Sequence, residues 1–241
     1  MLKNFIRSNS IYSLFKAFIP ENTSNIITAG HYPKKLLLNK TAPATILDLG
    51  CGAGNSIDLF SSINPEINWF GVDVEDSPEG KQRKRIDGNF RTYDGINLPY
   101  EDSFFDFIYS HQVLEHVRHP DDLLKEVFRV LKPGGYFTGS VSYLEPYHSL
   151  SIYNFTPYGI MVSLCDTGFQ LKEMRPGIDG PTLILRQMLN APQKLEPFFT
   201  RLSLFNLLVN ISGFIFQLGH REKNFLKIQF AGKVCFLAQK N

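Results

Sequence analysis

Short apolar segments alternate with stretches of helical hydrophobic spacing through the first half of the chain. An amphipathic helical segment is expected at the start of the chain and ends at Pro20. Residues 120–131 also have the spacing of a helix, and Asp121 and Asp122 lie in its first turn, where negative charge is favourable. Apolar runs typical of strands fall at residues 45–49, 69–74, 90–93, 105–109 and 136–142. This alternation predicts a parallel sheet whose strands are connected by helices.

The second half continues the pattern less regularly. Residues 132–135, Lys-Pro-Gly-Gly, predict the end of the preceding helix. A further helix is expected at 157–165, a strand at 169–174, and a last strand at 228–238 that Gly232 interrupts. The chain of 241 residues therefore suits a single α/β domain with some additional structure.

Composition narrows the possible partners. The 25 Lys and Arg residues nearly balance the 23 Asp and Glu residues, which argues against a nucleic-acid-binding surface. One basic run, residues 81–85, is expected to be a solvated loop or helix face. Cys51, Cys165 and Cys235 have no metal-ligand spacing, and the six histidines form no ligand pattern with acids, so no metal is expected. The low cysteine count and the lack of a secretory signal favour the cytoplasm.

A glycine-rich turn follows the first predicted strand. Residues 48–54 read Asp-Leu-Gly-Cys-Gly-Ala-Gly, and a helix-like stretch follows. The dinucleotide fingerprint Gly-x-Gly-x-x-Gly has a different spacing, and a carboxylate at Asp48 would repel a pyrophosphate. The acid would instead suit a ligand that carries an amine or a sulfonium cation.

This turn resembles motif I of the class I S-adenosylmethionine-dependent methyltransferases. Residues 98–106, 113–117 and 126–135, which read LPYEDSFFD, VLEHV and EVFRVLKPGG, resemble the type-11 methyltransferase family. The resemblance is strong over residues 44–142 and weaker beyond. It implies an enzyme that uses S-adenosylmethionine, with a Rossmann-like sheet of seven mostly parallel strands, helices on both faces and an antiparallel last strand.

The resemblance also implies a division of the single domain over residues 1–241. Residues 1–43 would lead in, 44–142 would bind the cofactor, 143–227 would form the acceptor side and lid, and 228–241 would form the last strand.

The family pattern assigns roles to the strand ends. Asp48 and the turn residues Gly50, Cys51, Gly52 and Gly54 would hold the methionine part of the cofactor. Asp73 would accept hydrogen bonds from the ribose hydroxyls, unless it only caps a helix, and Val74 would pack on the adenine. The adenine amine would meet Asp94, Gly95 and Ile96, and the sulfonium would lie near Ser110 and His111.

The acceptor side is predicted less sharply. Gln112, Tyr143, Tyr147 and Tyr153 would face the acceptor, and His111 or His148 would serve as a general base. For both histidines, an ordinary polar role at the surface is the alternative. Glu115 and His116 belong to a motif in which the pair is mainly structural.

Residues 198–218 form an unusual apolar segment with a narrow polar stripe: Ser203, Asn206, Asn210, Gly213 and Gln217. Three interpretations compete. The favoured one is a helix that covers the active site and packs on the core; the others are an apolar lid over a lipid-linked or aromatic acceptor, and an interfacial membrane contact that would make the protein membrane-peripheral. A transmembrane span is least favoured, because the chain must return to the sheet.

The sequence thus predicts in-line transfer of a methyl group from S-adenosylmethionine to a small-molecule, glycan or lipid-linked acceptor, with oxygen the favoured atom. A sugar hydroxyl on a glycan precursor is the leading substrate hypothesis. The alternatives are a quinone or lipid methylase that acts on carbon or oxygen, and a non-catalytic protein that binds the cofactor for regulation or assembly.

Overall fold

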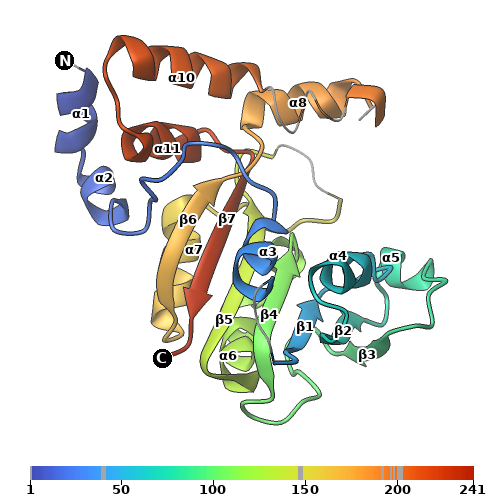
Figure 1. The fold of residues 1–241 in the computed structure, drawn as a ribbon. Helices are drawn as coiled ribbons and strands as arrows, with labels where there is room; N and C mark the ends of the chain where they lie inside the picture. Colours follow the sequence, from blue (N-terminus) through green and yellow to red (C-terminus); the bar gives the residue numbers. More distant parts are fainter. Residues whose placement is uncertain are drawn as a thin grey trace.

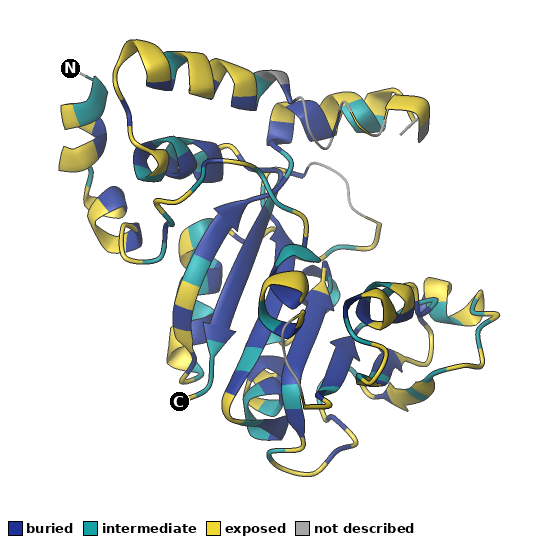
Figure 2. Cartoon of the chain, viewed as in Figure 1, coloured by how far each residue is buried: buried dark blue, intermediate teal, exposed yellow. Residues whose placement is uncertain are grey.

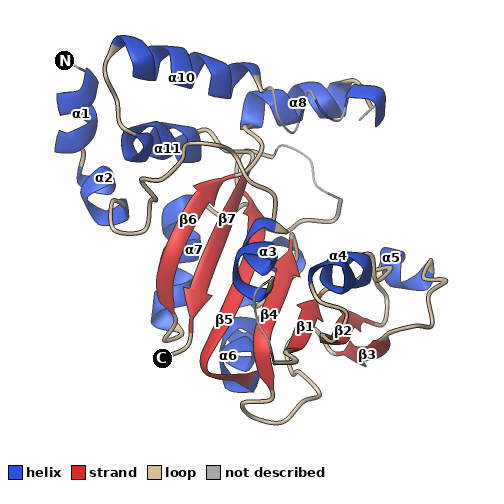
Figure 3. Ribbon diagram, viewed as in Figure 1, coloured by secondary structure: helices blue, strands red, loops and turns tan. Residues whose placement is uncertain are grey.

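The computed structural model describes residues 2–38, 42–145, 149–190, 193–195, 197, 199 and 203–241. A central sheet lies between two layers of helices, and a further group of helices lies over one end of the sheet (Figure 1). The strands in that sheet are drawn in red in Figure 3.

The sheet has seven strands in the order β3-β2-β1-β4-β5-β7-β6, and only β7 runs antiparallel to its neighbours. This confirms the predicted Rossmann-like sheet. The strands span Thr45–Leu49 (β1), Asn68–Val74 (β2), Asn89–Tyr93 (β3), Phe105–His111 (β4), Leu131–Ser142 (β5), Gln170–Pro176 (β6) and Lys233–Gln239 (β7).

Apolar side chains on both faces of the sheet explain the two helical layers. On one face, the strands share a buried core with α6 (Pro120–Val130) and α7 (Pro157–Asp166). On the other face, α3 (His31–Leu37) and α4 (Ser56–Ile63) cover β1 and β4. Parallel strands with both faces covered read as nearly continuous apolar runs, which is the pattern seen in the sequence.

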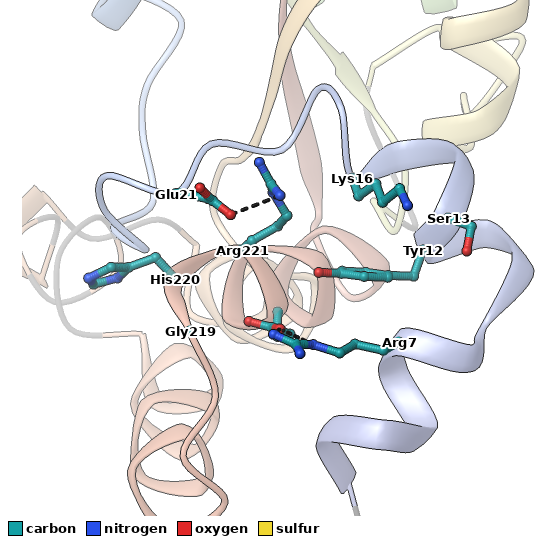
Figure 4. Close-up of a pocket in the computed structure, with 9 residues that line it drawn as sticks. Arg7, Tyr12, Ser13, Lys16, Glu21, Gly219, His220 and Arg221 are labelled. Carbon is teal, nitrogen blue, oxygen red and sulfur yellow. Dashed lines mark hydrogen bonds and ion pairs between the residues drawn. The ribbon is translucent and has the colours of Figure 1, made fainter.

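The remaining helices lie at the end of the sheet where the parallel strands finish. They are α1 (Leu2–Ser8), α2 (Ser10–Phe15), α8 (Gly180–Met188), α10 (Leu204–Ile215) and α11 (His220–Gln229), with short turns at α5 (Pro78–Lys81), η1 (Leu114–His116) and η2 (Gln193–Leu195). Two ion pairs tie the N-terminal segment to α11, Arg7 with Glu222 at 2.7 Å and Arg221 with Glu21 at 2.8 Å. They line a cavity of about 570 Å³ (Figure 4).

Three boundaries differ from the sequence predictions. The last strand begins at Lys233 rather than at 228, because residues up to Gln229 belong to α11. Residues 132–135 do end α6 at Val130, but they already belong to β5, with Gly134 at a φ of 77°. The N-terminal segment forms two short helices because Asn9 accepts hydrogen bonds from Ile11 N and Tyr12 N and thereby starts α2.

Candidate functional site

The strand order reverses direction between β1 and β4, with β2 and β3 on one side and β5 on the other. In open α/β sheets such a switch point leaves a crevice beyond the carboxyl ends of the strands, where ligands bind. The predicted site residues follow the ends of β1, β2, β3 and β4, so the fold gathers them along this edge.

The turn after β1 requires its glycines. Gly50, Gly52 and Gly54 have φ values of 70°, 49° and 80°, which side chains disfavour. A Cβ on Gly50 would lie 2.3 Å from Val113 Cγ2, and one on Gly54 would lie 2.8 Å from Phe90 Cζ. The three glycines therefore let this turn pack closely against neighbouring elements while exposing its backbone.

Asp48 lies at the base of this turn and is buried. Its Oδ2 accepts a hydrogen bond from the Ser56 hydroxyl, which in turn accepts one from Trp69 Nε1 at 2.9 Å. Burial raises the pKa of Asp48 to about 7, the bond from Ser56 opposes this shift, and the charge of Asp73 adds to it. A cationic group of a ligand placed nearby would favour the ionised carboxylate.

Asp73 connects the end of β2 to the glycine turn. Its Oδ2 accepts from Gly52 N at 2.7 Å and from Ser77 Oγ at 3.1 Å, and its Oδ1 accepts from Val74 N at 2.8 Å. Ser77, and not Asp73, caps the short helix α5, since Ser77 Oγ accepts from Gly80 N at 3.1 Å. The helix-cap alternative for Asp73 is therefore wrong, whereas its ribose role stays a prediction.

An apolar wall lies between the ends of β2 and β3. The Val74 side chain is 37% exposed at this edge. Gly95 has a φ of 95°, and a Cβ there would meet only Val74 Cγ1, at 3.9 Å. Such an open cradle beside an apolar side chain fits a flat aromatic ring, as the predicted adenine position requires.

Asp94 shapes the loop beside this wall. Its carboxylate accepts from Asn97 Nδ2 at 2.6 Å, Asn97 N at 2.7 Å and Ile96 N at 2.9 Å. These bonds, led by the one from the Asn97 side chain, lower the pKa of Asp94. The carboxylate therefore stays ionised at neutral pH and fixes the backbone of Gly95 and Ile96.

Arg83 covers the glycine turn, a contact that the sequence did not predict. Its Nε donates to Gly52 O at 2.8 Å, and its guanidinium lies 4.0 Å from the centroid of the Phe90 ring. The basic run 81–85 is thus only partly a solvated loop. Cys51, also in the turn, is buried, and burial raises its pKa to about 12, so this thiol has a packing role rather than a reactive one.

The end of β4 presents two side chains of different character. Ser110 is buried, and its hydroxyl has no hydrogen-bond partner among the described residues. His111 is exposed, and its ring stacks on Tyr109 with centroids 6.4 Å apart. A buried hydroxyl that lacks a partner at a strand end is a feature that a polar ligand would satisfy.

Gln112 begins a buried polar network where β4 and β5 end, on the predicted acceptor side. It has a φ of 56°, and its Nε2 lies 3.0 Å from Ser142 Oγ and 2.9 Å from Glu145 Oε2, while its Oε1 accepts from the ammonium of Lys233. Burial lowers the pKa of Lys233, although the neighbouring carboxylates of Glu145 and Glu115 oppose this. Sequence reasoning missed Ser142, Glu145 and Lys233, because each is an ordinary polar residue with no motif around it.

Glu115 is bonded to Ser142, a member of this network. It is fully buried, and its Oε1 lies 3.2 Å from Ser142 N and 2.9 Å from Ser142 Oγ. Its backbone oxygen also accepts from Ile152 N at 2.7 Å. These contacts hold the end of β5 in place, which agrees with the structural role expected of Glu115.

Of the predicted tyrosines, the two that the structure describes, Tyr143 and Tyr153, lie elsewhere. Tyr143 is half-buried and packs against the main core. Tyr153 donates to Arg118 O at 3.1 Å and lines a separate surface cavity of about 640 Å³ beside the start of α6. Tyr147 and His148 lie outside the described residues.

The described residues offer neither a metal site nor a membrane span. None of these residues form a group of three or more histidines, cysteines or acids placed to hold a metal ion. Within the same ranges, no helix is both long and apolar enough to cross a membrane.

Comparisons with known proteins agree with this geometry. Residues 47–138 match the family described as "Methyltransferase domain". The demethylmenaquinone methyltransferase of Lactobacillus johnsonii is 31% identical over 149 residues, which cover 56% of this chain and 61% of that protein. The trans-aconitate 2-methyltransferase of Methylobacterium nodulans is 36% identical over 95 residues, 39% of this chain and 36% of that protein. These alignments span less than two thirds of either relative.

A solved structure extends the likeness of fold to the whole chain. Phosphoethanolamine N-methyltransferase 2 of Haemonchus contortus, in complex with S-adenosyl-L-methionine, superposes with a TM-score of 0.55 at 19% identity. The superposition covers 100% of this chain and 60% of that one.

Proposed function

We propose that this chain, whose residues 47–138 match a methyltransferase domain, transfers a methyl group from S-adenosylmethionine to a small-molecule, glycan or lipid-linked acceptor. The observation that carries the proposal is the bond from Gly52 N to Asp73 Oδ2, which joins the glycine turn to an acid at the next strand end. The open cradle between Val74 and Gly95 lies along the same edge and fits the adenine ring.

The acids at the ends of β1, β2 and β3 would each bind a different part of the cofactor. Asp48 would face the cationic methionine part, Asp73 the ribose, and Asp94 with its loop the adenine amine. When bound, S-adenosylmethionine supplies a methyl group that its sulfonium makes electrophilic. The protein then has to align the acceptor with the methyl group and exclude water, and orientation of this kind is a large part of catalysis.

We place the acceptor beside the ends of β4 and β5. Gln112, Ser142 and Glu145 form a buried polar network behind these strand ends, bonded to one another. A polar rather than an apolar support at this end of the sheet favours an oxygen acceptor, with a sugar hydroxyl of a glycan precursor as the leading case. His111 is exposed at the end of β4, and we assign its imidazole as the group that would accept the acceptor proton.

A quinone or lipid acceptor is the second candidate. It is supported by the likeness to a demethylmenaquinone methyltransferase and by the exposed apolar side chains of α8 and α10, beside the acceptor end of the sheet. A quinone partitions into detergent or lipid, whereas a sugar stays in water. Acceptors of both types should therefore be tested.

The test has two stages. S-adenosylhomocysteine is first titrated into the protein by calorimetry, and transfer of labelled methyl groups from S-adenosylmethionine to the acceptor panel is then measured. Binding followed by transfer supports the proposal. Binding without transfer to any sugar, quinone or lipid acceptor would favour the non-catalytic alternative, and absence of binding by the folded protein would overturn the cofactor site itself.

A further inference from the structure

Helix α10 is oriented opposite to the favoured sequence interpretation. Its inward side carries Ser203 and Asn206 together with one apolar residue, Val209, and all three are buried. Its apolar side faces solvent, and Phe214 is 87% exposed. Five apolar residues share this outward face: Leu207, Leu208, Ile211, Phe214 and Ile215. The expectation of a helix whose apolar face packs on the core is therefore wrong.

Buried polar contacts fix this orientation. The Ser203 hydroxyl bonds to Asp179 Oδ2, and Asn206 Nδ2 lies 3.4 Å from the same oxygen. Near the middle of α10, Lys227 Nζ donates to Asn210 Oδ1 at 2.9 Å from the adjacent helix α11. Turning the apolar face inward would take the Ser203 and Asn206 bonds from the buried Asp179 carboxylate and the Asn210 bond from the Lys227 ammonium, so these buried charges favour the outward position of the apolar face.

Helix α8 extends the same surface. Its residues Ile184, Leu185, Met188 and Leu189 are exposed, and Met188 most of all, at 79%. Figure 1 shows α8 and α10 at the same outer end of the molecule, and Figure 2 shows exposed residues along both helices. We call the six residues Met188, Leu189, Leu208, Ile211, Phe214 and Ile215 the apolar platform. Large exposed apolar side chains gathered on neighbouring helices of a soluble protein commonly mark a binding surface.

Most of the charged residues around the platform are basic, with Glu222 of the adjacent helix α11 as an acidic exception. The described helices α1, α2, α8, η2 and α10 contain no acidic residue, whereas they carry Lys3, Arg7 and Lys194, besides Arg186, which lies near Lys233. Arg7 is neutralised by Glu222, but Lys3 donates to Gln217 O at 3.0 Å and so lies at the end of α10. Apolar side chains bordered by basic ones are typical of surfaces that bind anionic lipid.

We propose that the apolar platform docks on an anionic phospholipid membrane, with its apolar side chains in the interface and its basic residues at the headgroups. A second copy of the chain is a poorer occupant, because a two-fold interface would bring the like-charged borders together. Helix α8, which carries part of the platform, is also bonded to the polar network of the proposed acceptor side, since Gln187 Nε2 lies 3.3 Å from Glu145 Oε1. Docking of the platform would therefore place this end of the sheet next to the lipid.

This proposal is independent of methyl transfer and is tested by binding alone. The full chain is sedimented with vesicles of phosphatidylcholine, and of phosphatidylcholine mixed with phosphatidylglycerol. The test variant is Phe214→Ser/Ile215→Ser, and the matched control is Ile86→Ser, which changes a 95% exposed apolar residue in the loop between β2 and β3. Circular dichroism shows whether each variant is folded.

We expect the wild type and Ile86→Ser to bind the anionic vesicles alike, and the double variant to bind about tenfold or more weakly. Added salt and the variant Lys3→Gln/Lys194→Gln should reduce binding to the anionic vesicles. Three results would overturn the proposal: wild type that stays in solution with both vesicles, a folded double variant that binds like the wild type, or a dimer without lipid binding that the double variant dissociates.

Discussion

The amide of Gly52 donates a 2.7 Å hydrogen bond to Asp73 Oδ2, so the turn after β1 and the end of β2 form one unit. The acid is buried and receives two further bonds, from Val74 N and Ser77 Oγ. A ligand that reaches Asp73 must therefore lie against the backbone of the glycine turn, which is why the predicted ribose position and the glycine motif belong to the same site.

Asp73→Ala should weaken binding of S-adenosylhomocysteine by about tenfold or more, because hydrogen bonds to a charged group contribute roughly 1.5–3 kcal/mol each. Calorimetric titration measures the loss. Asp76→Ala is the control, since the Asp76 side chain is 94% exposed on the same segment and should leave binding unchanged. Equal affinity of Asp73→Ala and wild type would exclude the ribose role.

Asp48 should make stability depend on pH. Its pKa is about 7 in the folded protein and about 3.9 in an unfolded chain, so between these values the folded state holds a proton that the unfolded state has released. Wild-type stability should then fall as the pH rises from about 4 to 7, by about 2–4 kcal/mol in this contribution. Urea unfolding of wild type and Asp48→Asn checks this, and parallel pH profiles would contradict it.

The same carboxyl should couple cofactor binding to proton release. A cationic ligand favours ionised Asp48, so S-adenosylhomocysteine, through its amino group, should displace a proton at pH 6.5. Titrations in buffers with different ionisation enthalpies measure the number of protons released. Asp48→Asn should lose this component, and an identical proton count in both proteins would show that Asp48 does not face the amino group.

Glu115 should affect stability more through its shape and acceptor atoms than through its charge. Glu115→Ala leaves Ser142 N without its partner in a buried site, and we expect a loss of about 2–4 kcal/mol in the free energy of unfolding. Glu115→Gln keeps an acceptor oxygen and should cost much less. Glu101→Ala, at an exposed position, is the control. If Glu115→Ala unfolds like the control, the structural role is wrong.

Lys227 should stabilise the packing of α10 and the N-terminal segment on α11. Its Nζ donates to Ser24 O at 2.5 Å and Asn210 Oδ1 at 2.9 Å, and we expect Lys227→Met to cost about 1–3 kcal/mol. Burial lowers its pKa to about 8, so wild-type stability should rise as the pH increases from 8 to 10, where only the folded state releases the proton. Urea unfolding at both pH values measures both effects, and a pH slope retained by the variant would contradict this assignment.

The sequence alone determined where most of the strands lie along the chain, the glycine turn and the acids at the strand ends. These features are local, because a period of apolar residues or a run of glycines specifies its own backbone conformation. Helix ends at Pro120 and near residue 131 were predicted for the same reason, and the type of fold followed from the alternation of strands and helices.

Tertiary structure decided which side chains meet. Lys233 reaches Gln112 because β7 inserts beside β5, and Arg83 returns to Gly52 from a loop that looked only solvated. The hydrophobic pattern of α10 showed two faces but not which one turns inward. That choice depends on Asp179 and Lys227, two buried charges from distant segments whose desolvation requires the polar side of α10.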